Sequence, residues 1–345
     1  MSDTINIAEP VLEVKDLGVR YETSQGMVHA VSGVTFDVGK NEVFGIAGES
    51  GCGKSTLIRA LLRLLPDNAD STADRMRYLG MDLFAMSDAD FREKILWQEI
   101  SLVPQSAMNS LNPVYRVGDQ VIEAIRAHRS ISKVEAAERV AELFDVVGLQ
   151  SDLMQSFPHE FSGGMRQRAM IAMSLALDPG LIVMDEPTTG LDVLVQERIL
   201  RRIREIRAEI SSSIILITHD IAVIAELSDR IAIMYGGQFM EQASAIELFD
   251  NPSHPYTLGL KNAFPSIQNL GNELISIPGS PPTISGPISC CPFEPRCPFH
   301  IEQCAISLPQ PLDCGNGHEV RCFRGDEAEQ LRPLAADKNT WRSLN

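Results

Sequence analysis

A glycine-rich loop near the N-terminus constrains the fold of this chain more than any other feature. The segment EVFGIAGESGCGKSTLIRALLRLL places an apolar run, residues 43–46, before the loop and a helix-like stretch after it. The loop matches the pattern G-x-x-x-x-G-K-[ST], in which backbone N–H groups turn onto phosphate oxygens at a helix N-terminus. This order of strand, loop and helix predicts an α/β fold that binds phosphate through Gly48, Ser50, Gly51, Cys52, Gly53, Lys54, Ser55 and Thr56.

The side chains of this loop have separable expected roles. Lys54 is expected to reach the β and γ phosphates of a nucleotide, and Ser55 is expected to bind Mg²⁺. Cys52 is interpreted as a small residue that the loop tolerates rather than as a redox switch. The alternative is a glycine-rich turn that only joins a strand to a helix, and the strand and helix on either side argue against it.

A second candidate nucleotide element is the segment LIVMDEP, in which an apolar run at 181–184 ends in Asp185 and Glu186. Ligands of open α/β sheets bind at the carboxyl ends of the strands. Asp185 suits the outer sphere of Mg²⁺, and Glu186 suits a base that orients and deprotonates the water attacking a γ-phosphate. An apolar strand ending in two acids is also consistent with a surface turn. Beside a phosphate loop, the two acids predict ATP hydrolysis.

The segment HEFSGGMRQRAMIAMSLALDP decides the class of nucleotide-binding protein. Ser162, Gly163 and Gly164 precede a long helical stretch, so their N–H groups form a second anion site. Here the sequence resembles the ATP-binding cassette (ABC) family, whose signature is Leu-Ser-Gly-Gly-Gln. Phe161 and Met165 depart from its outer positions. The resemblance implies that the signature closes on the ATP held by a partner cassette.

Further family elements follow in order. Gln105 in SLVPQ resembles the glutamine that senses Mg²⁺ and the attacking water, so it joins Glu186 in the implied catalytic set. Asp192 in TTGLD resembles the loop that contacts the partner cassette, and His219 in LITHD resembles the switch histidine that contacts the γ-phosphate. For a lone histidine, a core or surface role is the usual alternative. Tyr21 is placed to stack on adenine, with an exposed strand tyrosine as the alternative.

The resemblance covers essentially the whole chain. It implies a P-loop ABC nucleotide-binding domain at about 1–250, with a β-rich core and a helical subdomain at about 106–179. Residues 251–345 form a C-terminal extension, in which NPSHPYTLGLKNAFP, IPGSPP and CPFEPRCP resemble the extension of ATPases that serve dipeptide, oligopeptide and nickel importers. The extension therefore indicates a narrower group than the cassette does.

Six of the seven cysteines lie in this extension, within residues 290–322. In a reducing cytoplasm, such clustered thiols point to a metal rather than to disulfides. The candidate ligands are separated by 5, 6 and 17 residues, unlike the paired C-x₂₋₄-C ligands usual for zinc, which favours an all-thiolate iron–sulfur cluster. Zinc and unmetallated thiols are the alternatives. The candidate ligands are Cys291, Cys297, Cys304 and Cys322.

The resemblance implies the same four cysteines, because some relatives hold a 4Fe-4S cluster in this extension. Cys290 and Cys314 are left over, although Cys290 could replace its neighbour. Prolines are frequent between residues 278 and 298 and leave little room for a regular core. The metal is therefore expected to fold this tail.

Composition argues against several classes of protein. A net charge of −16 disfavours nucleic acid as a partner. The start MSDTINIAEP lacks the pattern of a secretory signal, and no apolar run approaches the roughly 20 residues of a membrane span. The arginine-rich stretch ILRRIREIRAEI is the basic exception, and helical spacing of its apolar residues predicts a solvated arginine face. The apolar residues are Leu200, Ile203, Ile206 and Ile210.

The resemblance implies the ATP-hydrolysing subunit of an ABC importer, bound peripherally at the cytoplasmic face of the membrane. The implied partners are a second ABC ATPase, either a related chain or a second copy, two permease subunits and an extracytoplasmic solute-binding protein. Peptides lead as the solute, with oligosaccharides and nickel complexes as alternatives. The rival functions are a non-transport ABC ATPase and an iron–sulfur sensor. The former usually needs a long heptad insertion or a second cassette, and neither pattern occurs in this sequence.

Overall fold

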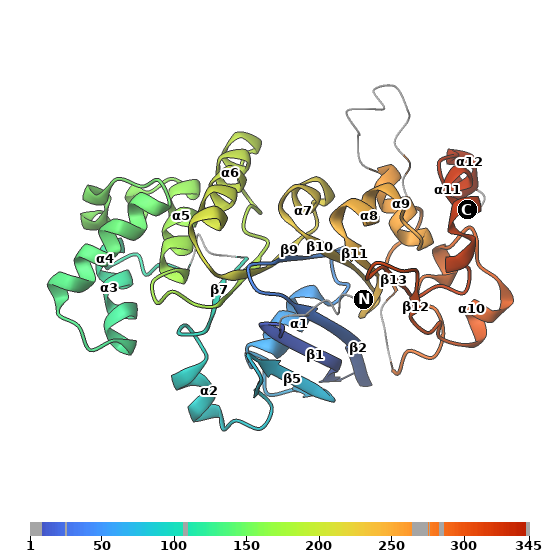
Figure 1. Ribbon diagram of the computed structural model, residues 1–345, viewed down its shortest axis with the longest axis horizontal. Coiled ribbons are helices and arrows are strands. Elements are labelled where there is room, and N and C mark those ends of the chain that lie inside the picture. Colours follow the sequence, from blue (N-terminus) through green and yellow to red (C-terminus); the bar gives the residue numbers. More distant parts are fainter. Residues whose placement is uncertain are drawn as a thin grey trace, which may run out of the picture. The chain divides into compact units, whose positions relative to one another are not determined.

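The computed structural model (Figure 1) describes residues 9–24, 26–105, 110–263, 275, 277–282 and 286–342. The chain divides into two compact units. Unit 1 comprises residues 1–12, 38–43 and 77–217, and unit 2 comprises residues 13–37, 44–76 and 218–345. Each unit is therefore built from three separate stretches of sequence. The expected domain boundary near residue 250 stays a prediction.

Unit 1 contains parallel strands made from apolar runs of the sequence. Strand β8 pairs in parallel with β7 on one side and with β9 on the other. The apolar run 181–184 is buried, and so is the whole of β9. Continuous burial is typical of parallel strands that are covered on both faces. The bounds are β7 Ile100–Val103, β8 Leu181–Asp185 and β9 Ser213–Thr218.

Helices make up most of the rest of unit 1, and α3, α4 and α5 lie together in Figure 1. Helix α4 begins with a capping box, in which Ser132 and Glu135 each accept the other's backbone N–H through a side-chain oxygen. The bounds are β6 Met81–Asp82, α2 Asp88–Lys94, α3 Val117–His128, α4 Lys133–Val146, α5 Gly163–Ser174 and α6 Val193–Glu209, with 3₁₀ segments at Ser151–Gln155 and Pro158–Glu160.

Helix α6 contains the arginine-rich stretch. Leu200, Ile203 and Ile206 are buried along one side of the helix, and Arg201 lies exposed. The predicted apolar spacing is confirmed for these three residues. Ile210 follows the end of the helix as its C-cap residue and is only half-buried, so it does not extend the apolar face.

Unit 2 contains a mixed sheet with the strand order β12-β13-β11-β10-β3. Strand β10 is parallel to β3 and antiparallel to β11. Separately, β1 pairs with β2 and, in antiparallel fashion, with β4. Strand β5, Arg75–Tyr78, belongs partly to each unit. The other bounds are β1 Leu12–Thr23, β2 Gly26–Val38, β3 Val43–Ala47, β4 Ala69–Thr72, β10 Arg230–Tyr235, β11 Gln238–Ser244, β12 Leu312–Asp313 and β13 Glu319–Val320.

The helices of unit 2 are short. Within the described part of the chain, no helix is long and apolar enough to cross a membrane. Their bounds are α1 Lys54–Leu61, α7 Ile221–Leu227, α8 Ala245–Asp250, α9 Pro255–Ala263, α10 Glu302–Ile306, α11 Ala328–Ala335 and α12 Lys338–Arg342, with 3₁₀ segments at Glu294–Arg296 and Gly325–Glu327.

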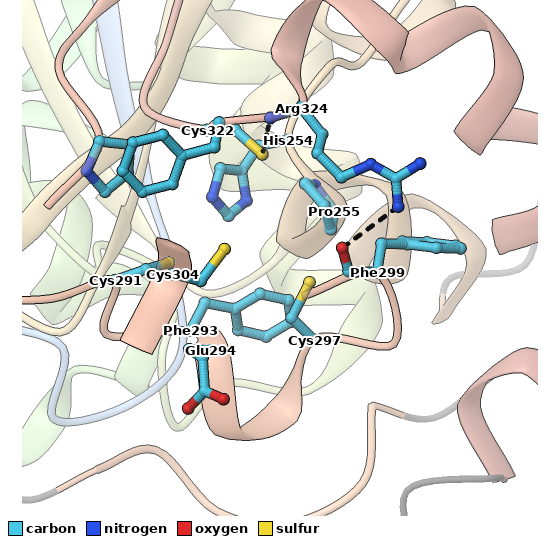
Figure 2. Close-up of a pocket in the computed structure, with 12 residues that line it drawn as sticks. His254, Pro255, Cys291, Phe293, Glu294, Cys297, Phe299, Cys304, Cys322 and Arg324 are labelled. Atoms are coloured by element: carbon cyan, nitrogen blue, oxygen red, sulfur yellow. Dashed lines mark hydrogen bonds between the residues drawn. The ribbon is translucent and has the colours of Figure 1, made fainter. Parts of the chain in front are cut away.

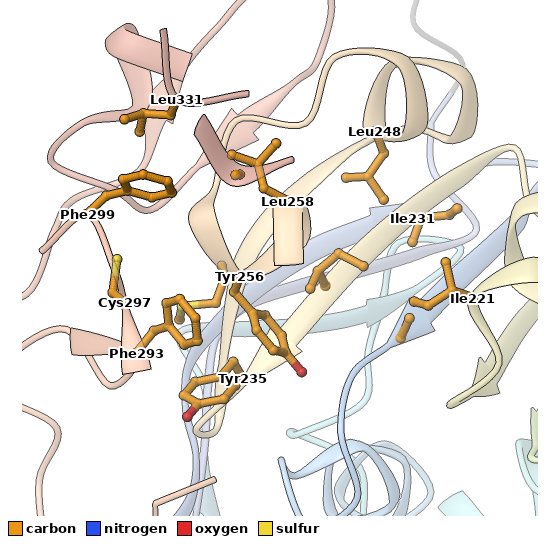
Figure 3. Close-up of a cluster of buried hydrophobic side chains, with 14 of the residues drawn as sticks. Ile221, Ile231, Tyr235, Leu248, Tyr256, Leu258, Phe293, Cys297, Phe299 and Leu331 are labelled. Atoms are coloured by element: carbon orange, nitrogen blue, oxygen red, sulfur yellow. The ribbon is translucent and has the colours of Figure 1, made fainter. Parts of the chain in front are cut away.

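The C-terminal extension contributes to an apolar core, although its prolines were expected to leave little room for a regular one. Figure 3 shows Tyr235 of β10, Tyr256 of α9 and Phe293 packed together, with ring centroids 4.6 to 5.3 Å apart. Phe299 and Trp341 extend this buried cluster. The regular elements between residues 290 and 322 are five residues long or shorter. Aromatic packing therefore provides order that the short helices and strands do not.

Candidate functional site

The phosphate-binding loop follows the buried strand β3 and needs glycine at two positions. A Cβ on Gly48 would lie 2.1 Å from the Met234 carbonyl oxygen, and a Cβ on Gly53 would lie 2.4 Å from the Ala30 carbonyl oxygen. Gly53, the N-cap of α1, has a φ of 111°, which favours glycine. Gly51 also has a positive φ but faces open space. The loop is therefore shaped by close backbone contacts on its inner side.

Lys54 is buried and lies across the inner side of this loop. Its Nζ donates to the carbonyl oxygens of Gly48 at 2.7 Å and of Glu49 at 2.9 Å. It also lies 3.5 Å from the Sγ of Cys52. Burial raises the pKa of the Cys52 thiol, although Lys54 acts in the opposite direction. Cys52 therefore fills space inside the loop as a neutral thiol.

Four other predicted residues also belong to unit 2. The hydroxyl of Tyr21 on β1 lies 3.3 Å from the Thr56 hydroxyl on α1, and Ser55 is half-buried beside Thr56. His219 is exposed between β9 and α7. The next residue, Asp220, caps α7 by accepting two backbone N–H groups through its carboxylate. Helix capping by its neighbour therefore sets the backbone on which His219 stands.

In unit 1, Glu186 stands directly after Asp185, at the carboxyl end of β8. It has a φ of 49°, a left-handed conformation that costs a non-glycine residue about 1–2 kcal/mol. Its backbone N–H donates to the Ile217 carbonyl oxygen at 2.9 Å. Its Oε2 accepts from Gln105 Nε2 at 2.7 Å and from the Thr189 hydroxyl at 2.8 Å. Gln105 and Glu186, predicted separately, are thus in contact.

Thr189 was not among the residues predicted from the sequence. Its place in the run PTTGLD, three residues after Glu186, was the available signal. A hydroxyl three residues beyond a carboxylate can reach it across a tight turn, and the backbone N–H of Thr189 does donate to the Glu186 carbonyl oxygen at 3.2 Å. The turn therefore supplies a second donor to the carboxylate.

The signature segment begins helix α5. Ser162 is exposed and is the N-cap residue, and its hydroxyl accepts the Met165 N–H at 3.3 Å. A Cβ on Gly164 would lie 2.5 Å from Cγ1 of Val195, so α5 and α6 pack too closely there for a side chain. Phe161, which departs from the family signature, is buried and fills a core position. The departure at Phe161 therefore leaves the exposed cap intact.

Asp192 is the N-cap residue of α6, and its carboxylate accepts the Val195 N–H at 3.0 Å. Val193 and Leu194 follow it with 78% and 72% of their surface exposed. Two adjacent exposed apolar side chains at a helix start are consistent with a contact surface. Sequence reasoning named Asp192 for partner contact but did not single out its two apolar neighbours.

The predicted nucleotide residues are divided between the two units. Unit 2 holds the phosphate loop, Tyr21 and His219, and unit 1 holds Asp185 and the signature together with Gln105, Glu186 and Asp192. Inside unit 2 the loop contacts its own Lys54, and Tyr21 contacts Thr56. Inside unit 1 the contact is between Gln105 and Glu186.

The four predicted cysteine ligands line one pocket in unit 2 (Figure 2). The pocket is enclosed by His254, Phe293 and Phe299, and its free volume is about 10 Å³. None of the seven cysteines forms a disulfide. The described residues hold no group of three or more His, Cys, Asp or Glu side chains already arranged to bind a metal ion. The four are Cys291, Cys297, Cys304 and Cys322.

Burial changes the acidity of these thiols. It raises the pKa of Cys291 to about 11 and that of Cys322 to about 12, with smaller contributions from neighbouring cysteines. The pKa of Cys297 is raised by the same cause. The three thiols are therefore protonated at neutral pH, and a metal has to displace their protons. Of the two left-over cysteines, Cys290 is half-buried and Cys314 is exposed.

Comparison with known families matches both parts of the chain. A family described as "ABC transporter" matches residues 31–189, which contain the phosphate loop and the signature. A family described as "Oligopeptide/dipeptide transporter, C-terminal region" matches residues 240–304. The second match includes three of the four pocket cysteines.

Individual proteins are similar over nearly the whole length. The chain is 40% identical over 332 residues to the dipeptide transport ATP-binding protein DppD of Bacillus subtilis, covering 95% of this chain and 99% of that protein. It is 41% identical over 319 residues to the oligopeptide transport ATP-binding protein OppD of Escherichia coli, covering 92% and 94%. A solved dimeric structure of the ATP-binding cassette MJ0796 with ADP and Pi shares the fold, with a TM-score of 0.59 and 24% identity over 68% of this chain and 98% of that chain.

The fold and the order of the motifs define a P-loop ATPase of the cassette type. The chain belongs to the ABC transporter family. Within that family it carries the C-terminal region of the oligopeptide and dipeptide transporters. The family resemblance drawn from the signature segment and the extension is confirmed.

Proposed function

We propose that this chain is the ATP-hydrolysing subunit of an ABC importer that takes up peptides. The relatives named above are ATP-binding proteins of dipeptide and oligopeptide transport, and their matches cover 95% and 92% of this chain. The oligopeptide/dipeptide C-terminal region supports the same choice over oligosaccharides or nickel complexes. As an importer ATPase, the chain works at the cytoplasmic face of the membrane, held there by permease subunits.

The observation that carries the hydrolytic role is the Glu186 carboxylate at the end of β8. Gln105 and Thr189 both donate to its Oε2, which fixes the orientation of the carboxylate. The left-handed backbone of Glu186 is a strained conformation of the kind that is kept at functional sites. Glu186 therefore acts as the general base, and Gln105 orients it.

The nucleotide's phosphates are bound by the loop of unit 2. Its backbone N–H groups and the buried Lys54 ammonium provide the positive field that three phosphates require. Ser55 would bind Mg²⁺ and Asp185 would act in its outer sphere, and the bound ion would neutralise charge on the phosphates. Tyr21 stacks on the adenine, and His219 contacts the γ-phosphate from its exposed position after β9.

The signature helix acts on the nucleotide of a partner cassette. Ser162 is exposed at the N-terminus of a 12-residue helix, where backbone N–H groups and the helix dipole attract an anion. Gly163 and Gly164 continue this N-terminus. Next to Asp192, the exposed pair Val193 and Leu194 provides an apolar contact for the same partner. The partner is a related ATPase or a second copy of this chain.

We infer that the cysteine pocket holds a 4Fe-4S cluster. The chemistry of the donor set supports this, because four thiols from separate segments line one pocket and four thiolates suffice for such a cluster. Because its free volume is about 10 Å³, the pocket would have to widen to hold the cluster. A bound cluster supplies cross-links between the segments that carry Cys291, Cys297, Cys304 and Cys322. Zinc bound by the same thiols is the lesser alternative.

A transport assay tests the proposed function. The chain is reconstituted with its permease subunits and a second cassette in ATP-loaded vesicles, with the solute-binding protein and a labelled oligopeptide outside. The proposal predicts ATP-dependent accumulation of the peptide that stops when Glu186→Gln replaces the wild-type chain. ATP hydrolysis by a chain that never associates with permeases would favour a non-transport ATPase or a sensor instead.

A further inference from the structure

Two side chains of the C-terminal extension contact the phosphate-binding loop within unit 2. Arg296 ends the 3₁₀ segment Glu294–Arg296, and its Nη1 donates to both oxygens of the Glu49 carboxylate, at 2.9 and 3.2 Å. The hydroxyl of Tyr256 on α9 accepts the backbone N–H of Glu49 at 3.1 Å. Glu49 directly follows Gly48, so both contacts fall on the loop itself.

The Arg296 side chain is held from several directions. Only 8% of it is exposed, and 24% of the Glu49 side chain is exposed. Its Nε donates to the Pro278 carbonyl oxygen at 2.8 Å, and its Nη1 lies 3.2 Å from the Tyr235 hydroxyl. An arginine with this many contacts is already ordered, so its ion pair avoids most of the entropy loss that weakens pairs on the surface. The guanidinium therefore determines where the Glu49 carboxylate lies.

Tyr256 is held just as firmly. It is completely buried, and its ring packs against Tyr235 and Phe293 in the aromatic cluster of Figure 3. Its hydroxyl oxygen uses the Glu49 N–H as a donor. That N–H is therefore directed to the extension. The two contacts together hold one loop residue, main chain and side chain, against the extension.

The charge of Glu49 makes its position matter. The loop binds phosphates through N–H groups and a lysine, and a free carboxylate one residue from Gly48 would repel the same phosphates. Arg296 neutralises this carboxylate and keeps it in place. The interaction joins residues 247 apart in the sequence, which is why no local motif predicts it.

We propose that Arg296 and Tyr256 are positioning residues for the phosphate-binding loop, through which the C-terminal extension sets the affinity of the loop for ATP. They act through Glu49 and touch no substrate themselves. The inference goes beyond the transport function, but it rests on the proposed role of the loop in binding ATP.

The test measures the Kd of Mg·ATP for the purified full chain, with a fluorescent ATP analogue. Arg296→Ala is expected to raise the Kd about tenfold, because an unpaired carboxylate then lies beside the phosphates. Glu49→Gln alone is expected to bind ATP within about twofold of the wild type, and the double variant Arg296→Ala/Glu49→Gln to recover that affinity. Arg75→Ala, which removes a surface arginine paired with Glu13, is the matched control and leaves the Kd unchanged.

A purely structural role of Arg296 gives a different pattern. If Arg296 only ties the extension down, Glu49→Gln breaks the same tie, weakens ATP binding as much as Arg296→Ala does, and the double variant shows no recovery. That pattern, or a wild-type Kd for Arg296→Ala, would overturn the proposal. Arg296→Lys keeps the positive charge and is measured in case Arg296→Ala does not fold. The lysine variant is expected to bind ATP more tightly than Arg296→Ala does.

Tyr256→Phe tests the second contact, because it removes only the acceptor oxygen and keeps the ring. It is expected to raise the Kd about threefold, in line with the loss of one hydrogen bond to a neutral donor. An unchanged Kd would remove Tyr256 from the proposal. Loss of ATP binding in Lys54→Ala is measured alongside; if that variant binds ATP normally, the proposed function fails, whatever the Arg296 variants show.

Discussion

The phosphate-binding loop and the cysteine pocket both belong to unit 2, but they are built in opposite ways. The loop consists of consecutive residues between a buried strand and a helix, and its shape comes from glycine contacts such as that of Gly48 with Met234. The pocket takes four cysteines from separate segments with almost no regular structure, and aromatic side chains bring these segments together. A local motif thus makes one site, and tertiary packing makes the other.

The difference extends to how each site meets its ligand. The loop offers polar N–H groups and a charged lysine, which bind phosphate without first losing a proton. The pocket offers thiols whose pKa burial raises to about 11 and 12 at Cys291 and Cys322, so they lose protons only when a metal takes their place. We therefore expect the loop to bind its ligand over a wide range of conditions and the pocket to depend strongly on metal supply.

The largest expected effect is the loss of iron when one pocket thiol is removed. Cys297→Ser, purified without oxygen, is expected to fall from about four iron per chain to none and to lose its brown colour, because a 4Fe-4S cluster needs four thiolates. Cys314→Ser, which changes an exposed cysteine outside the pocket, keeps its iron. Iron and sulfide analysis with absorption spectra measures both. One zinc and no iron per wild-type chain would contradict the cluster and show that the pocket binds zinc instead.

The same variant separates the two regions. Because aromatic packing also holds the extension, Cys297→Ser is expected to keep a folded cassette. Its Kd for Mg·ATP is expected to stay within about tenfold of the wild type, the increase expected when the neighbouring Arg296 no longer holds Glu49. Nucleotide binding measures whether the cassette still binds ATP, and limited proteolysis of residues 290–322 measures whether the extension stays ordered. Complete loss of ATP binding in a folded sample would mean that the regions are not separable.

A separate effect, on catalysis rather than on binding, is expected at Glu186. Glu186→Gln should lower ATP turnover about 100-fold while leaving the Kd of ATP nearly unchanged, because the amide cannot take a proton from water. Glu99→Gln is the matched control, since Glu99 is a unit 1 carboxylate that accepts a hydrogen bond from Tyr78. Steady-state hydrolysis and nucleotide affinity are measured for both variants. Near-normal turnover in Glu186→Gln would remove Glu186 from the role of base.

The smallest effect concerns acid stability of the extension. Burial lowers the pKa of His254 to about 4, partly opposed by Glu241, whereas an unfolded histidine titrates near 6.5. Between these values the unfolded state binds more protons, so the free energy of unfolding should fall by up to about 1.4 kcal/mol for each pH unit as the pH drops from 6.5 to 4. Above pH 6.5 histidine is neutral in both states, so the stability associated with the neutral, buried His254 is fully present.

Chemical denaturation at several pH values measures this slope. His254→Asn, whose side-chain oxygen can still accept the Tyr256 N–H, is expected to have a shallower slope below pH 6.5. His159→Asn, at an exposed position, is expected to keep the wild-type slope. Equal slopes in the wild type and His254→Asn would show that His254 titrates normally in the folded chain.

Particular residues show why prediction from the sequence succeeded in one region and stopped in the other. The strand at 181–184 was predictable from its continuous apolar run, and the loop was predictable because strand, glycines and lysine are adjacent. Gln105 and Glu186 were predicted separately, and their contact arises in the structure because the strands that precede them, β7 and β8, pair in parallel. The Arg296–Glu49 pair could not be predicted, because nothing local marks residues 247 apart as neighbours.

The apolar core of the extension was missed for a related reason. The prolines at 278–298 predict little room for a regular core, but they disfavour long helices and strands rather than aromatic packing. Trp341 and Phe293, both buried in that core, lie far from each other in the sequence. Ile210 was predicted to lie on the apolar face of a helix from its spacing, but α6 ends at Glu209, one residue before it.

The most direct test of the account is calorimetric titration of the full chain with Mg·ATP, comparing the wild type with Lys54→Ala. The account predicts saturable binding of one ATP per wild-type chain and a loss of about 100-fold or more in affinity when the buried ammonium is removed from the loop. Circular dichroism should show that the variant remains folded. Equal affinities of the wild type and a folded Lys54→Ala chain would contradict the account.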